Sequence, residues 1–202
     1  MAAVKLGIVG GTFDPLHVGH LVLAEQAREQ LGLAQVLWVP SGDPWRKSGR
    51  AVSPSRQRLD MVRLAIADNA AFQLCTLEVD RPGPTYSVDT LTALRAQHPE
   101  AELVFLVGLD ALEDLPRWHR PEQIMQLATL AVAPRGSDRL SREHLERLLP
   151  GLADAVVWVE IPRIDVSATD LRRRAAEGRS LRYLVPDAVE AYIREHKLYR
   201  RE

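Results

Sequence analysis

The sequence predicts an α/β fold with a doubly wound parallel sheet, followed by a small C-terminal helical segment. Two observations favour this class. Short apolar runs alternate with amphipathic stretches from one end of the chain to the other. The apolar runs are rich in Val, Ile and Leu, as parallel strands that are covered on both faces require. With right-handed crossovers, such a chain places helices on both faces of the sheet.

Six runs have the composition expected of buried strands. Each is five or six residues long and is followed by glycine, proline or a polar stretch that can form a turn. The predicted strands are Val4–Val9, Gln35–Val39, Phe72–Leu77, Leu103–Val107, Thr129–Ala133 and Val156–Ile161.

The stretches between and after these runs have helical periodicity. Ser167-Ala168-Thr169-Asp170 has the form of a capping box, and Gly178 is placed to end the helix that it opens. A proline in the first turn is typical of a helix start, which fits Pro186. The predicted helices are Val18–Leu31, Pro54–Asp68, Val88–Ala96, Pro121–Leu127, Arg142–Leu149, Ser167–Ala176 and Pro186–His196.

The length of the chain favours a single domain. With 202 residues it can bury one good core, whereas two domains would be crowded. No internal repeat, low-complexity tract or interdomain linker interrupts it, so we expect residues 1–202 to form one domain. The loops 40–54 and 80–86 are rich in Pro, Gly and charged residues, and loops of this kind are often functional.

Composition restricts the partners. The net charge of −1 provides no broad basic field, so we expect no nucleic-acid partner. The apolar runs are too short for a membrane span, and no basic leader precedes a long apolar segment. Cys75 is the only cysteine and lies in an apolar run, as a buried structural thiol would. We therefore expect a cytoplasmic protein without a membrane partner; the sequence leaves its oligomeric state open.

The most informative segment, G-G-T-F-D-P-L-H-V-G-H, follows the first predicted strand at residues 10–20. Gly10 and Gly11 allow a ligand to approach the backbone closely, although the spacing matches neither the dinucleotide pattern nor the P-loop. His17 and His20 share one face of a helix N-terminus, where the dipole favours an anion. A zinc site is a weaker alternative, because no third ligand accompanies the pair. The segment predicts a phosphate site suited to nucleotidyl transfer.

These residues resemble the signature of the H/T-x-G-H nucleotidyltransferase superfamily. Over nearly its whole length the chain is similar to the bacterial nicotinate-nucleotide adenylyltransferase family. The resemblance implies a Rossmann-like nucleotidyltransferase fold and a catalytic role for His17, His20 and Arg172. It also implies ATP binding by Gly10, Gly11, Thr12, Phe13, His17 and His20.

A second motif, Val166-Ser167-Ala168-Thr169-Asp170-Leu171-Arg172, resembles the family segment I-S-S-T-x-I-R. A helix start with two hydroxyls and an arginine is a suitable second clamp for phosphates, although alone it would indicate only a capped helix with a surface arginine. The resemblance implies that Ser167, Thr169 and Arg172 hold the ATP phosphates. Ala168 replaces the second serine of the family, which removes a hydroxyl.

The loop after the second predicted strand resembles the family's Pro-Pro-His-Lys/Arg loop. In this chain Trp45 and Arg46 replace the second proline and the histidine, and Lys47 retains the positive charge. The resemblance implies that Lys47 binds an ATP phosphate. The alternative is a solvated basic loop, since exposed Arg and Lys are common.

The residues that bind the acceptor, the substrate that receives the nucleotidyl group, are expected in two further segments. Residues 81–87 resemble the family's substrate-recognition loop, whose main-chain amides select the acid form of the pyridine. Trp118 would stack on that ring, Asp110 would bind a ribose, and the backbone of His119 would lie near the carboxylate. From the residues alone, Tyr86 and Trp118 fit a core position as well. The predicted substrate-binding residues are Thr85, Tyr86, Ser87, Asp110, Trp118 and His119.

The resemblance implies adenylyl transfer from ATP to nicotinate mononucleotide, in NAD biosynthesis. Mg²⁺ would arrive with ATP, held mostly by phosphate oxygens, without a metal site of the protein's own. Alternatives are transfer to nicotinamide mononucleotide or pantetheine phosphate, a cytidylyltransferase, and a non-catalytic nucleotide sensor on the same fold. A fragment of a class I aminoacyl-tRNA synthetase is disfavoured, because neither a lysine-rich second signature nor an anticodon-binding region is present.

Overall fold

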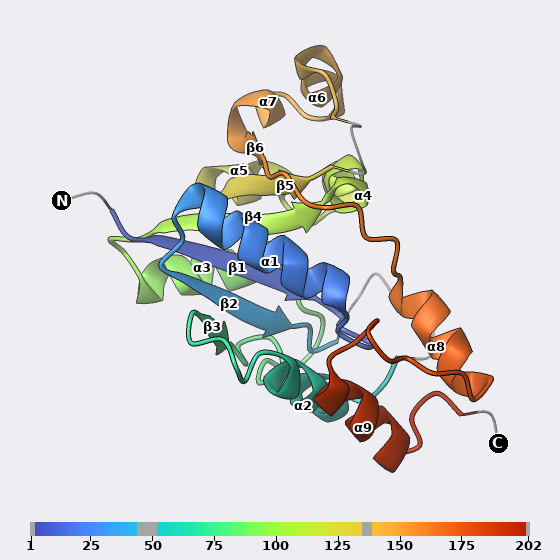
Figure 1. The fold of residues 1–202 in the computed structure, drawn as a ribbon. Helices are drawn as coiled ribbons and strands as arrows, with labels where there is room; N and C mark the ends of the chain where they lie inside the picture. Colours follow the sequence, from blue (N-terminus) through green and yellow to red (C-terminus); the bar gives the residue numbers. More distant parts are fainter. Residues whose placement is uncertain (1–2, 44–51, 135–138, 201–202) are drawn as a thin grey trace.

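The computed structural model describes residues 3–43, 52–134 and 139–200, which form an α/β fold around one six-stranded sheet (Figure 1). All strand pairs are parallel, in the order β3-β2-β1-β4-β5-β6. The predicted fold class is therefore confirmed. The strands are β1 Lys5–Gly11, β2 Gln35–Pro40, β3 Phe72–Leu74, β4 Glu102–Gly108, β5 Thr129–Ala133 and β6 Val156–Trp158.

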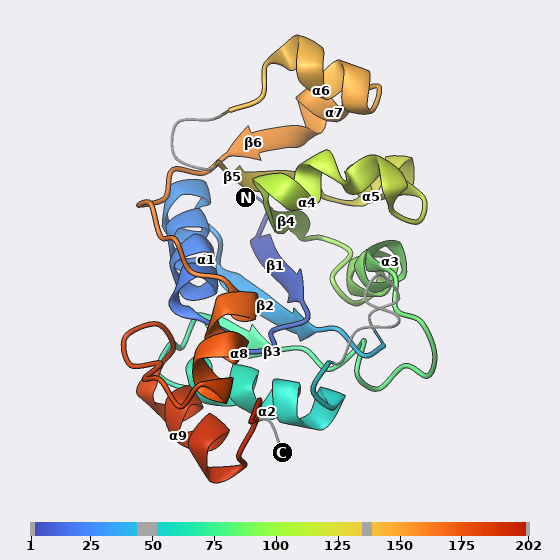
Figure 2. The ribbon, with the colours of Figure 1, turned by 90° about the vertical axis from the view of Figure 1, so that its right-hand side faces the viewer.

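Helices cover both faces of this sheet. Figure 2 shows α1 on one side and α3, α4 and α5 on the other, with α6 and α7 beyond the edge strand β6. The C-terminal helices α8 and α9 lie on the same side as α1, near α2. The helices are α1 Val18–Leu31, α2 Ser55–Ala65, α3 Ser87–Gln97, α4 Leu109–Glu113, the 3₁₀ helix η2 Leu115–Arg117, α5 Pro121–Leu127, α6 Arg142–Leu148, α7 Leu152–Ala155, α8 Ala168–Ala176 and α9 Asp187–Glu195.

Alternate residues of each central strand supply the two cores. In β4, Val104 and Leu106 pack with the α1, α2, α8 and α9 side, whereas Leu103 and Phe105 pack with the α3 to α5 side. Because side chains alternate along a strand, a fully apolar run is needed to fill both layers. This requirement explains why the strands read as continuous apolar runs.

Two predicted strands end earlier than expected. β3 stops at Leu74 because the chain turns at Thr76, whose hydroxyl donates to Asp80. β6 stops at Trp158, and the backbone N–H of Glu160 donates to the Gln30 side chain of α1 instead of to a strand. The short helices α4, η2 and α7 were not predicted, since five residues or fewer carry no readable periodicity.

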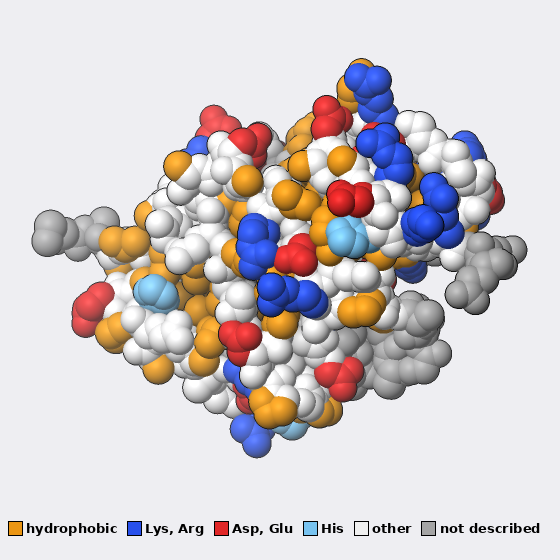
Figure 3. All heavy atoms as spheres, turned by 90° about the horizontal axis from the view of Figure 1, so that it is seen from below, with side chains coloured by type: hydrophobic (Ala, Val, Ile, Leu, Met, Phe, Trp, Pro, Cys, Tyr) orange, Lys and Arg blue, Asp and Glu red, His pale blue; other side chains and the backbone are white. Residues whose placement is uncertain are grey.

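On the face seen from below, basic and acidic side chains are interspersed (Figure 3). On α2, for example, Asp60 pairs with both Arg56 and Arg63. Within the described parts of the chain, we found no helix long and apolar enough to span a bilayer.

Candidate active site

A large cavity opens at the carboxyl ends of β1, β4 and β5. Its volume is about 1190 Å³. β1 and β4 are neighbours in the sheet, and the chain continues from β1 to β2 on one side and from β4 to β5 on the other. Ligands of doubly wound sheets bind at such a switch point. The predicted residues that line the cavity are Gly10, Gly11, Thr12, His17, His20, Thr85, Tyr86, Ser87, Asp110, Trp118, His119 and Ser167.

His17 and His20 form a stacked pair at the start of α1. Their ring centroids are 3.7 Å apart with an interplanar angle of 26°. The backbone N–H of His17, the N-cap residue, donates to Nδ1 of His20 at 3.2 Å. Because Nδ1 of a neutral His20 accepts this bond, its proton lies on Nε2, which makes that nitrogen a donor. No acidic residue lies in the first turn of α1, so its positive dipole end keeps its attraction for an anion.

His17 is buried, and burial lowers its pKa from 6.5 to about 4. Among the described residues, its Nδ1 has no hydrogen-bond partner. The imidazole is therefore neutral at neutral pH. A Cβ at Gly19 would lie 3.2 Å from this nitrogen, so glycine avoids crowding the ring.

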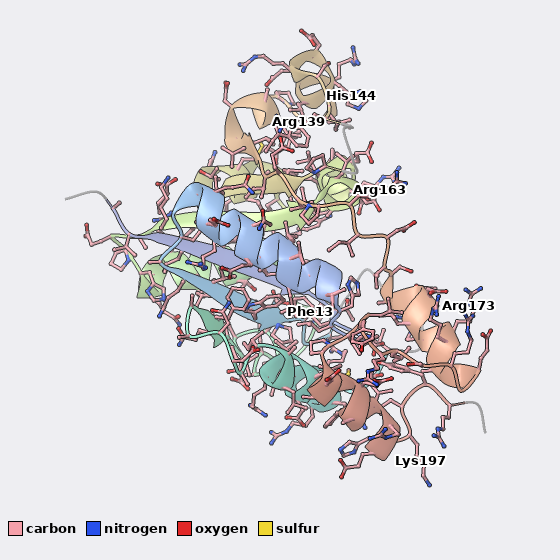
Figure 4. All side chains as sticks on the ribbon, in the orientation of Figure 1. Phe13, Arg139, His144, Arg163, Arg173 and Lys197 are labelled. Carbon is pink, nitrogen blue, oxygen red and sulfur yellow. The ribbon has the colours of Figure 1, made fainter. Side chains whose placement is uncertain are left out.

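Phe13 lies behind the histidines and does not line the cavity. It is buried, and its ring meets the edge of the His20 ring at a centroid distance of 5.2 Å. Its backbone is left-handed, with φ at 49°. Figure 4 labels Phe13 inside the molecule, near the start of α1. Phe13 therefore supports the position of His20.

The second predicted motif begins α8 beside the same loop. Ser167 is the N-cap residue, and its hydroxyl accepts from the backbone N–H of Asp170 at 3.2 Å. The Arg172 guanidinium donates to the carbonyl oxygen of Asp14 at 2.7 Å and to the Thr169 hydroxyl at 3.2 Å. The structure thus joins residues 158 positions apart in the sequence. Thr169 and Arg172 lie beside the cavity wall without lining it.

The opposite wall is aromatic and contains the start of α3. Tyr86 is the N-cap residue of α3 and makes no side-chain bond to its first turn. Its ring lies 4.5 Å from that of His119, and the Trp118 ring lies 6.2 Å from that of Phe105. The indole Nε1 of Trp118 is buried without a partner among the described residues. Asp110 follows β4 in the first turn of α4.

Several cavity residues were not predicted. Glu78 is 8% exposed, and burial raises the pKa of its carboxyl although the Thr90 hydroxyl donates to it at 2.8 Å. Ser41 and the segment 161–166 also line the cavity. Figure 4 shows Arg163 on this segment, between β6 and α8. In the sequence, Glu78 is marked only by its position, directly after the apolar run that contains Cys75 and Leu77.

Lys47 lies outside the described residues, as do Trp45 and Arg46, so their predicted roles stay predictions. Within residues 3–43, 52–134 and 139–200, no group of three or more His, Cys, Asp or Glu side chains is arranged to hold a metal ion.

The fold and the cavity define the class: an α/β protein of the nucleotide-binding type. A loop with Gly10 and Gly11 leads from β1 to the N-terminus of α1 at the switch point of its sheet. The comparisons narrow it further. The family model described as cytidylyltransferase-like matches residues 8–174. A "probable nicotinate-nucleotide adenylyltransferase" of Thermomicrobium roseum is 48% identical over 97% of this chain and 92% of its own length. A protein of the same name from Dehalococcoides mccartyi is 44% identical, with 100% of both chains covered.

Solved structures agree on the fold. The Plasmodium falciparum nicotinic acid mononucleotide adenylyltransferase complexed with NaAD has a TM-score of 0.80 at 18% identity, and 97% of each chain is covered. The same enzyme complexed with APC has a TM-score of 0.79. The chain belongs to the nicotinate-nucleotide adenylyltransferase family, within the cytidylyltransferase-like nucleotidyltransferases. The family resemblance predicted from the sequence is confirmed.

Proposed function

We propose that this protein transfers the adenylyl group of ATP to nicotinate mononucleotide, yielding nicotinate adenine dinucleotide and pyrophosphate in NAD biosynthesis. One observation carries the proposal. A single cavity has two histidines at a helix N-terminus on one wall, and an aromatic wall with a second helix N-terminus opposite. The first wall suits a triphosphate, and the second suits an aromatic ring that bears a carboxylate. The names of the relatives support the same reaction.

The reaction is a direct displacement. An oxygen of the mononucleotide 5′-phosphate forms a bond to the α-phosphorus of ATP while the bond from that phosphorus to the bridging oxygen breaks. Pyrophosphate leaves with that oxygen and its electron pair. No covalent enzyme intermediate is needed, and catalysis consists of positioning and charge stabilisation.

On the ATP side, the histidines donate to the transferred and leaving phosphates. The neutral imidazole of His17 and the Nε2–H of His20 act as hydrogen-bond donors. The backbone of Gly10, Gly11 and Thr12 lies next to them on the cavity wall. From α8, Ser167, Thr169 and Arg172 form the second clamp, and Lys47 is proposed as a further phosphate ligand. Mg²⁺ enters as part of the substrate, on the phosphate oxygens of ATP.

On the acceptor side, Trp118 stacks on the pyridine ring and Asp110 accepts from ribose hydroxyls. The backbone amides near Tyr86 and His119, together with the start of α3, recognise the carboxylate of nicotinate. The backbone N–H and the hydroxyl of Thr85 donate to the carbonyl of Asp43 at 3.2 and 3.3 Å and hold this backbone, and Ser87 binds the substrate from the cavity wall. Burial raises the pKa of the Glu78 carboxyl, which lines the same cavity.

Two wider properties belong to the same proposal. One family model covers residues 8–174 without a break, which supports a single nucleotidyltransferase domain over residues 1–202. An enzyme that uses ATP and a free mononucleotide fits a cytoplasmic location.

The test measures pyrophosphate release from ATP with one acceptor at a time: nicotinate mononucleotide, nicotinamide mononucleotide and 4′-phosphopantetheine. We expect the largest kcat/KM with nicotinate mononucleotide. Turnover with 4′-phosphopantetheine alone would overturn the proposal. Binding of ATP without turnover on any acceptor would favour a nucleotide sensor.

A further inference from the structure

Helix α2 carries a fully buried arginine that does not line the cavity. Arg58 is 1% exposed, whereas the side chains of Arg56 and Arg63 on the same helix are 82% and 53% exposed and pair with Asp60. Arg58 lies in the first turn of α2, where the dipole disfavours a cation, and burial lowers its pKa. Only specific partners can offset both costs.

Those partners are backbone carbonyls from three separate segments. Nε of Arg58 donates to Ser53, one terminal nitrogen donates to Thr12, and the other donates to Gly42, each at 2.9 Å. The planar guanidinium fork can satisfy three acceptors in fixed directions, which a lysine cannot do. The negative charge of Asp14 opposes the lowering of the Arg58 pKa.

Gly42 belongs to a short segment, residues 41–43, that lies between the two walls of the cavity. On the ATP side, the backbone N–H of Ser41 donates to the carbonyl of Gly11 at 2.9 Å. On the acceptor side, the backbone N–H of Thr85 donates to the carbonyl of Asp43 at 3.2 Å. A Cβ at Gly42 would lie only 2.1 Å from the carbonyl oxygen of Glu78, so the two backbones are in direct contact.

We propose that Arg58 is a positioning residue that sets the spacing between the ATP-side loop at Thr12 and the acceptor-side segment at residues 78–85, acting through residues 41–43. The inference rests on the proposed function, because the spacing matters only if both substrates meet in this cavity. Each substrate keeps the contacts of its own wall when the spacing changes. The alignment of the 5′-phosphate oxygen with the α-phosphorus is lost, and a misplacement of about 1 Å costs about 10²-fold in rate.

The first test compares Arg58→Lys with Arg63→Lys, which alters an exposed arginine of the same helix. We expect kcat of Arg58→Lys to fall about 10- to 100-fold, while KM for ATP and for nicotinate mononucleotide each change less than about threefold. Arg63→Lys should keep wild-type values. All rates are divided by the folded fraction from urea unfolding curves, because an unfolded population would also lower the apparent kcat.

Gly42→Ala tests the same spacing with Arg58 intact. Its methyl group pushes against the Glu78 backbone, so we expect the same loss of kcat at nearly constant KM. If either variant is less stable but has wild-type kcat per folded molecule, Arg58 has a purely structural role and the inference is wrong. A higher KM at unchanged kcat would overturn it too. A wild-type protein without turnover on nicotinate mononucleotide would instead refute the proposed function.

Discussion

The buried imidazole of His17 predicts a specific loss of stability in weak acid. Burial lowers its pKa from 6.5 to about 4 in the folded protein. Between these two values the unfolded chain binds a proton at this site and the folded protein does not. Stability therefore decreases as the pH falls from about 6.5 to about 4, and the contribution of this group is constant outside that window.

The size of the effect follows from the two pKa values. Lowering the His17 pKa from 6.5 to about 4 means that the free energy of unfolding falls by about 3 kcal/mol by the pH at which both states are fully protonated. At pH 5 about 2 kcal/mol of this is already lost relative to pH 7.5. The assay is urea unfolding of the wild type and of His17→Asn at both pH values. Asparagine keeps a good N-cap for α1 and removes the titration.

We expect the stability difference between pH 7.5 and pH 5 to be about 2 kcal/mol smaller in His17→Asn than in the wild type. Other groups titrate over this range in both proteins, so the comparison between variants isolates His17. His196→Asn, at an exposed histidine after α9, is the matched histidine-to-asparagine control. Equal differences in His17→Asn and the wild type would refute a buried, neutral His17.

Three further variants test the site and the loop. His20→Ala should lower kcat about 10²- to 10³-fold and keep the fold, because it removes a donor to the reacting phosphates; near-normal pyrophosphate release would contradict this. Trp118→Ala should raise KM for nicotinate mononucleotide about tenfold and leave KM for ATP unchanged, and equal changes in both would contradict the stacking role. Tyr199→Phe should lower the free energy of unfolding by about 1.5 to 3 kcal/mol, since its hydroxyl donates to the Asp14 carboxylate at 2.7 Å. Tyr183→Phe, at a position 77% exposed, is its control, and equal unfolding curves for the two would refute the contact.

The parts of the molecule that the sequence predicts are those with local signals. The bounds of α1, β5 and α5 match the expected ranges, because each segment combines a clear apolar pattern with a terminal glycine, proline or polar residue. The histidine pair was predicted because its spacing and the preceding glycines lie within one short segment. The topology then brings Ser167 and Trp118 to the same cavity, as expected for a ligand site at the carboxyl edge of a parallel sheet.

The contacts that support the site have no such signal. Helical spacing places Arg58 on the same face as Met61 and Val62, but it does not show which backbone carbonyls the guanidinium binds. Asp14 also has a partner far away in the sequence, because the Tyr199 hydroxyl donates to its carboxylate across 185 positions. Such contacts depend on how the loops fold together, so only the three-dimensional structure reveals them.

Under the proposed function, the two walls of the cavity also account for the direction of transfer. ATP carries most of the charge, and the wall with His17, His20 and the start of α1 offers donors for it. The opposite wall, with Trp118 and the N-terminus of α3, suits one ring and one carboxylate. In this proposal the α-phosphorus lies between the walls, where the acceptor phosphate reaches it from the side opposite the leaving pyrophosphate. We propose that backbone amides at the start of α3 select the acid over the amide, in which case the side chains alone do not determine the acceptor.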